Sequence, residues 1–69
     1  MINYRPLWIT LAERSLSKAE FKEVAGISSA TLTKLNKNNY VSLEVVDRIC
    51  ESMNINVDKV IEIERGDKE

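Results

Sequence analysis

The sequence predicts a single compact all-α domain, and three observations lead to this prediction. The chain has 69 residues and a mass of 7.9 kDa, which is enough for one small hydrophobic core. Hydrophobic residues make up 43% of it and charged residues 30%, a balance typical of folded domains. Two Gly and one Pro interrupt the chain, and its apolar residues recur at steps of three and four nearly throughout. We therefore expect a five-helix domain over residues 1–64, followed by a disordered tail at 65–69.

The first two helices are indicated by the residues at their ends. The first begins near Pro6, whose missing N–H suits a first turn. Its apolar face is formed by Tyr4, Leu7, Trp8, Leu11 and Ala12. The second begins after Ser17, which makes a capping box with Glu20, and ends at Gly26, where a left-handed residue is expected. Its predicted buried residues are Phe21, Val24 and Ala25.

Three further helices follow the same logic. Ser28, Ser42 and Asn56 are predicted N-caps, and the third helix is expected to run to about Lys37. The apolar face of the fourth helix consists of Leu43, Val46, Ile49, Cys50 and Met53, and that of the fifth consists of Val57, Val60 and Ile61. The segment 61–64 alternates apolar and acidic residues, so it extends the last helix, frays, or pairs as a strand with residues 2–4.

Composition excludes several classes of protein. With no His and one Cys, the chain has no familiar zinc site, no Ser-His-Asp triad and no internal disulfide. We therefore predict a protein that is not an enzyme, with no catalytic residues, metal, cofactor or small-molecule substrate. No apolar run approaches the roughly 18 residues of a membrane span, and no secretory signal is visible. We expect a cytoplasmic protein without a membrane partner, and we expect Cys50 to be buried in the core.

The segment from Ser17 to Asn39 has the helix-turn-helix pattern, because two short helices meet at a tight turn at Gly26. Residues 25–32 and 41–55, together with the core residues Phe21 and Leu35, resemble the Cro/C1-type helix-turn-helix of the XRE family. The resemblance covers residues 4–63 and implies a five-helix, lambda-repressor-like domain that regulates transcription. The chain is also similar to small VanU-type regulators carried with vancomycin-resistance operons. One residue departs from the pattern: Lys22 stands where a small residue is usual, so it must extend outward or the two helices must separate slightly.

The outward face of the third helix has the chemistry of a DNA-reading surface. Small side chains at its start would let the helix enter a major groove about 12 Å wide, where Ser29 and Thr33 could bond base edges and Ala30 could touch a thymine methyl. Lys34 could reach guanine or a phosphate, and the start of the helix suits phosphate oxygens. The predicted DNA-binding residues are Lys18, Ser28, Ser29, Ala30, Thr31, Thr33, Lys34, Lys37, Asn38 and Asn39. Tyr40 is expected to pack over the adjoining loop, with a phosphate contact as the alternative.

Two other interpretations remain open. Ser, Thr, Ala and Lys also make an ordinary solvated helix face, and residues 40–69 hold eight acidic against four basic residues. The alternative function is therefore a protein-interaction module, such as an antitoxin or antirepressor partner, with the same fold and no DNA. A basic surface around Lys18, Lys34 and Lys37 would favour double-stranded DNA, and an apolar patch there would favour a protein. For DNA, we expect a homodimer on an inverted repeat, formed through the apolar end of the chain that includes Val57, Ile61 and Ile63.

Overall fold

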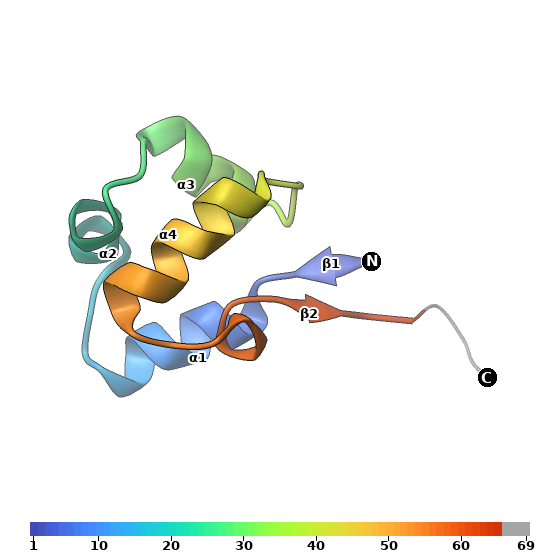
Figure 1. The fold of residues 1–69 in the computed structure, drawn as a ribbon, viewed down its shortest axis with the longest axis horizontal. Helices are drawn as coiled ribbons and strands as arrows, with labels where there is room; N and C mark the ends of the chain where they lie inside the picture. Colours follow the sequence, from blue (N-terminus) through green and yellow to red (C-terminus); the bar gives the residue numbers. More distant parts are fainter. Residues whose placement is uncertain (66–69) are drawn as a thin grey trace.

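The computed structural model describes residues 1–65 and contains, over that range, four α-helices, one short 3-10 turn and two short strands (Figure 1). In chain order the elements are β1 (Ile2–Asn3), α1 (Arg5–Glu13), α2 (Lys18–Ala25), α3 (Ser29–Asn36), α4 (Leu43–Met53), η1 (Val57–Lys59) and β2 (Glu62–Ile63). The predicted fifth helix is thus a single turn. None of the helices in residues 1–65 is long and apolar enough to cross a membrane. The expected disordered tail lies outside the described residues, apart from Arg65, which is exposed.

The two ends of the domain are joined by a two-stranded antiparallel sheet, so the domain is mostly helical, with four α-helices and this small sheet where five helices were expected. Strand β1 pairs with β2, with Ile2 opposite Ile63 and Asn3 opposite Glu62. The side chain of Asn3 also donates to the Glu64 carboxylate at 2.7 Å. Of the three possibilities for residues 61–64, the strand is the one observed. Both strands lie together at one end of the molecule, beside α1 (Figure 1).

The predicted helix ends are confirmed where a local signal marks them. The Glu20 amide donates to the Ser17 hydroxyl at 3.0 Å, and the Ser17 amide donates to the Glu20 carboxylate at 2.9 Å. Ser28 and Ser42 each accept the backbone N–H three residues further on. Asn56 precedes η1 without a side-chain cap. These contacts satisfy backbone N–H groups that would otherwise lack partners at the helix starts.

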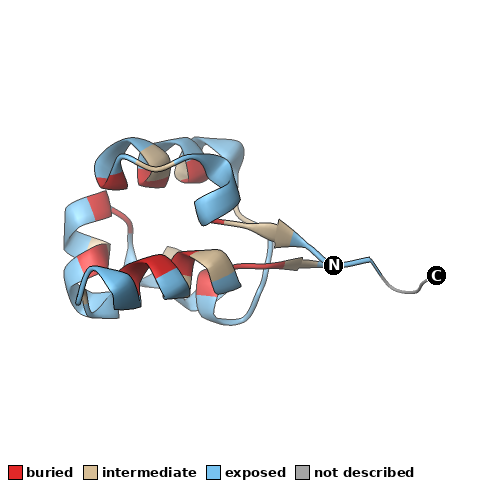
Figure 2. Ribbon diagram, turned by 90° about the horizontal axis from the view of Figure 1, so that it is seen from below, coloured by how far each residue is buried: buried red, intermediate tan, exposed pale blue. Residues whose placement is uncertain are grey.

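The core lies between the helices, and buried residues turn inward from each of them (Figure 2). Its members are Tyr4, Leu7, Leu11, Phe21, Ala25, Ile27, Leu35, Val46, Ile49, Met53 and Val60. Four residues expected in apolar stripes are instead exposed, namely Ala12, Val24, Leu43 and Val57. Val24 keeps 51% of its surface exposed, whereas Phe21 and Ala25 of the same helix are buried. Trp8 and Cys50, both expected to be core, are half-buried against its edge.

Candidate nucleic-acid interface

The turn between α2 and α3 is built around Gly26. This residue has φ +67° and ψ 35°, a left-handed conformation that glycine adopts at little cost. Its N–H donates to the Glu23 carbonyl at 3.2 Å, and the N–H of Ile27 donates to the Lys22 carbonyl at 3.1 Å. The side chain of Ile27 is buried in the core. Backbone bonds and one apolar anchor thus hold the start of α3 against the end of α2.

The outward face of α3 is exposed along its length. Ser29, Ala30, Thr33 and Lys34 are all exposed, whereas Leu35 is buried beneath them. The Thr33 hydroxyl donates to the Ser29 carbonyl at 3.0 Å. Its proton is therefore used within the helix, and its oxygen lone pairs are what it offers to a partner.

The residues that begin α3 are hydrogen-bonded to each other. The Ser28 hydroxyl accepts the Thr31 backbone N–H at 3.1 Å and donates to the Thr31 hydroxyl at 3.0 Å. Ser28 is exposed and Thr31 is half-buried. This pair orders the first turn of α3, where backbone N–H groups point out of the helix and attract an anion.

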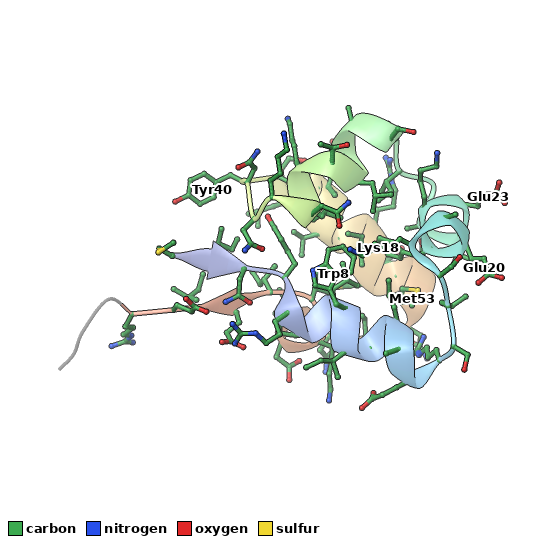
Figure 3. All side chains as sticks on the ribbon, turned by 180° about the vertical axis from the view of Figure 1, so that it is seen from behind. Trp8, Lys18, Glu20, Glu23, Tyr40 and Met53 are labelled. Carbon is green, nitrogen blue, oxygen red and sulfur yellow. The ribbon has the colours of Figure 1, made fainter. Side chains whose placement is uncertain are left out.

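Lys18 is held in place by two other helices. Its ammonium lies 4.2 Å from the centroid of the Trp8 ring on α1, close enough for a cation–π interaction. The same ammonium donates to the Asn36 side-chain oxygen, at the end of α3, at 2.6 Å. Figure 3 shows Lys18 directly beside Trp8. Sequence reasoning selected Lys18 but missed Trp8 and Asn36, because these contacts join three helices and leave no local pattern.

Lys22 extends outward, which resolves its departure from the family pattern. Its side chain is half-buried, and its ammonium donates to the Ser29 hydroxyl at 2.9 Å. The residue thus reaches the exposed start of α3. Sequence reasoning treated Lys22 as an awkward packing residue and did not include it in the candidate surface. A lysine at a position that is usually small was the one available signal.

The loop between α3 and α4 divides its residues between the fold and the surface. The backbone of Asn38 is left-handed, with φ +57°. Its side-chain oxygen accepts the Tyr4 backbone N–H at 3.3 Å. The Asn39 carbonyl accepts the Tyr4 hydroxyl proton at 2.6 Å. Tyr4 is fully buried, and burial raises the pKa of its phenol. The loop is therefore fastened to the core through Tyr4, and Lys37 and Asn39 remain exposed beside it.

Tyr40 does not pack over this loop, contrary to expectation. It keeps 79% of its surface exposed, and its ring projects into solvent from the rest of the molecule (Figure 3). A shallow surface hollow beside it is lined by Met1, Ile2 and residues 37–40. The phenol is consequently accessible next to the end of α3.

The positive charges around the exposed face of α3 come from α2, from α3 itself and from the loop that follows it. Lys18, Lys34 and Lys37 are exposed. Glu20 and Glu23 project from α2, far from Tyr40 in the view of Figure 3. Within residues 1–65, no three His, Cys, Asp or Glu side chains are grouped as a metal site requires. The arrangement brings hydrogen-bonding hydroxyls and Lys34 together on the exposed face of α3, with Lys18 and Lys37 on neighbouring segments.

Comparison with known proteins gives two matches. The family model described as a Cro/C1-type HTH DNA-binding domain matches residues 6–65. Among solved structures, the chain is similar to the crystal structure, form II, of the transcriptional regulator VanUg, with 41% sequence identity and a TM-score of 0.85. That similarity covers 88% of this chain and 81% of the other. No curated protein matches the sequence. The family match runs from α1 through β2 and includes the whole of α2, the Gly26 turn and α3.

Proposed function

This chain belongs to the Cro/C1-type helix-turn-helix DNA-binding family, and from that premise we propose that it regulates transcription by reading the major groove of specific DNA sequences with α3. One observation carries the proposal: Ser29, Ala30, Thr33 and Lys34 form a single exposed face of that helix. Such a protein works on DNA in the cytoplasm. It contributes position and hydrogen bonds and performs no catalysis.

The side chains of α3 suit direct reading of bases. The helix has eight residues, which at about 1.5 Å each makes it roughly as long as the major groove is wide. Small residues at its start let the backbone approach the base edges. Thr33, whose proton is used inside the helix, accepts from the amino group of adenine or cytosine. Ala30 meets a thymine methyl, and Lys34 reaches guanine or a phosphate.

Contacts to phosphates set the position of α3 in the groove. The first turn of α3 binds one phosphate through its unpaired backbone N–H groups and the Thr31 hydroxyl, whose proton is free because the Ser28 hydroxyl donates to Thr31. Lys18 binds another with an ammonium already held by Trp8 and Asn36, so little conformational freedom is lost on binding. Lys37, Asn38 and Asn39 contact the backbone beyond the end of α3. For Asn38, the donor is its side-chain amide, because its oxygen accepts from the fold.

The composition of this surface supports DNA as the partner in preference to a protein. Within residues 1–65, the exposed large hydrophobic side chains are Met1, Ile9, Val24, Tyr40, Leu43, Val57 and Ile63. None of these lies on α3. A protein-binding module would be expected to expose an apolar patch on the surface it uses.

A homodimer on an inverted repeat completes the proposal. One module contacts few base pairs, so two copies with half-sites about 34 Å apart would raise both affinity and specificity. Val57 and Ile63 are exposed and Ile61 is half-buried between them in sequence. We propose this apolar end as the surface through which two copies associate.

The proposal is tested by a salt-titrated binding assay against DNA upstream of the protein's own gene, compared with random DNA. Lys34→Ala is expected to weaken specific binding about tenfold, since one charged hydrogen bond is removed. If Lys34 contacts a phosphate, the slope of log affinity against log salt also falls by about 0.9. Arg48→Ala is the control, because Arg48 is an exposed cation in the middle of α4. Equal, negligible effects of both variants would contradict the assignment of α3.

A further inference from the structure

Lys22 adds a positive charge to the start of α3 that the functional proposal does not use. Its Nζ lies 2.9 Å from the Oγ of Ser29, which is the first residue of α3 and is exposed. The ion pairs within residues 1–65 involve Arg5 and not Lys22. The ammonium therefore acts on the Ser29 hydroxyl without an acidic partner to share it.

This contact determines the polarity that Ser29 presents to a ligand. A serine hydroxyl has one proton to donate and two lone pairs that accept, and it normally rotates to suit its partner. An ammonium has only protons to donate, so it occupies a lone pair of Ser29 and attracts the oxygen end of the hydroxyl dipole. The Ser29 proton is consequently directed away from Lys22, so Ser29 has a proton to donate to a ligand and one lone pair left to accept with.

Thr33, one turn further along the same face, has the opposite polarity. Its proton is bonded to the Ser29 carbonyl at 3.0 Å, so it presents lone pairs. Both hydroxyls lie on the exposed face of α3. The helix thus offers a donor near its start and an acceptor one turn later, and each is set by a contact inside the protein.

We propose that Lys22 is a specificity-determining residue, which biases Ser29 toward donating a hydrogen bond and thereby disfavours cytosine at the base that Ser29 reads. This inference rests on the proposed function of α3. In the major groove guanine, thymine and adenine each present an acceptor, whereas cytosine presents only its amino group, which is a donor. Two donors facing each other make no hydrogen bond. Lys22 acts through Ser29 and is a positioning residue.

The test selects binding sites from a random duplex library with the wild-type chain and with variants. Ser29→Ala first identifies the base position that depends on Ser29. Lys22→Met is expected to admit cytosine at that same position, with discrimination against cytosine falling roughly threefold to tenfold, the range one hydrogen bond supplies. Lys22→Ala, which has the small side chain usual at this position, should do the same. Lys22→Arg keeps a cationic donor and should restore the discrimination against cytosine.

Two controls separate this effect from a general loss of structure. Arg48→Met removes a positive charge from α4 and should leave every base preference unchanged. The double variant that combines Lys22→Met with Ser29→Ala should show the same frequency of cytosine at the Ser29-dependent position as Ser29→Ala alone. A purely structural role for Lys22 would weaken binding to all sequences alike.

The outcomes distinguish the two proposals. If the wild-type chain enriches no sequence, the proposed function is wrong. If it enriches a sequence, but both Lys22 variants leave the frequency of cytosine at the Ser29-dependent position unchanged, the role of Lys22 is wrong and the proposed function stands. A change confined to other positions would overturn the role of Lys22 in the same way.

Discussion

Replacing Gly26 by alanine tests how far a single backbone conformation stabilises the helix-turn-helix. Gly26 has φ +67°, and a Cβ built at this position meets no heavy atom within 4 Å. A steric clash with the rest of the protein therefore does not contribute to the cost. What remains is the intrinsic penalty of a left-handed residue that has a Cβ, which is about 1–2 kcal/mol. Alanine also reduces the entropy of the unfolded chain, which offsets roughly 0.4–1 kcal/mol of this penalty.

The expected net effect of Gly26→Ala is thus a loss of about 1 kcal/mol in the free energy of unfolding. For a domain of this size, 1 kcal/mol lowers the Tm by roughly 4–8 °C. Urea unfolding followed by the fluorescence of Trp8 measures the loss, because Trp8 is the only tryptophan and is half-buried. Gly26→Asn is the matched variant, since asparagine tolerates the left-handed region better, and it should lose less than alanine does.

Specific DNA binding well below the Tm should persist in Gly26→Ala. The buried side chain of Ile27 and its backbone bond to the Lys22 carbonyl still hold α3 against α2. The reasoning is refuted if the alanine variant is as stable as the wild-type chain, or if asparagine is the more damaging substitution. A loss of several kcal/mol would also refute it, since that would require a clash the structure does not contain.

Three further predictions concern groups with perturbed pKa values. Tyr4→Phe removes the 2.6 Å hydrogen bond to the Asn39 carbonyl and should cost about 1–2 kcal/mol in urea unfolding. Because burial raises the pKa of Tyr4, its stabilisation is present below about pH 10 and is lost as pH rises through the folded pKa, so Tyr4→Phe should flatten that alkaline decline. The Ser17 backbone N–H, and then its hydroxyl, lower the pKa of Glu20. The ionised Glu20 carboxylate therefore stabilises the fold above its unfolded pKa, near 4.3, and this stabilisation is lost as pH falls through the folded pKa. If the free energy of unfolding depends on acid pH in the same way in Glu20→Ala as in the wild-type chain, this reasoning is contradicted. Burial, with Asp47 and Asp58, raises the pKa of Cys50, so iodoacetamide at neutral pH should alkylate the folded chain more slowly than the urea-unfolded chain.

Much of the candidate site was predictable because the exposed face of α3 follows from helical periodicity. Once Leu35 is assigned to the core, the 3.6-residue period places Ser29, Ala30, Thr33 and Lys34 outward, as the structure has them. What periodicity does not determine is how each polar atom is used. The commitment of the Asn38 oxygen to Tyr4 and the contact from Lys22 to Ser29 both depend on segments packed against α3 from elsewhere in the chain.

The sequence by itself determined where helices begin and end, because those signals act over three or four residues. Ser17 with Glu20, Gly26, Ser28 and Ser42 each satisfy or terminate a neighbouring backbone hydrogen bond, so they need no distant partner. The tertiary structure alone decided which apolar residues are covered and how the ends of the domain are joined. Residues 62–63 form a strand because residues 2–3, about sixty positions earlier, supply the hydrogen-bonding partner, and Val24 keeps half of its surface exposed although Phe21 and Ala25 of the same helix are buried. Contacts of that kind depend on closing a long loop of chain, and no short stretch of sequence encodes them.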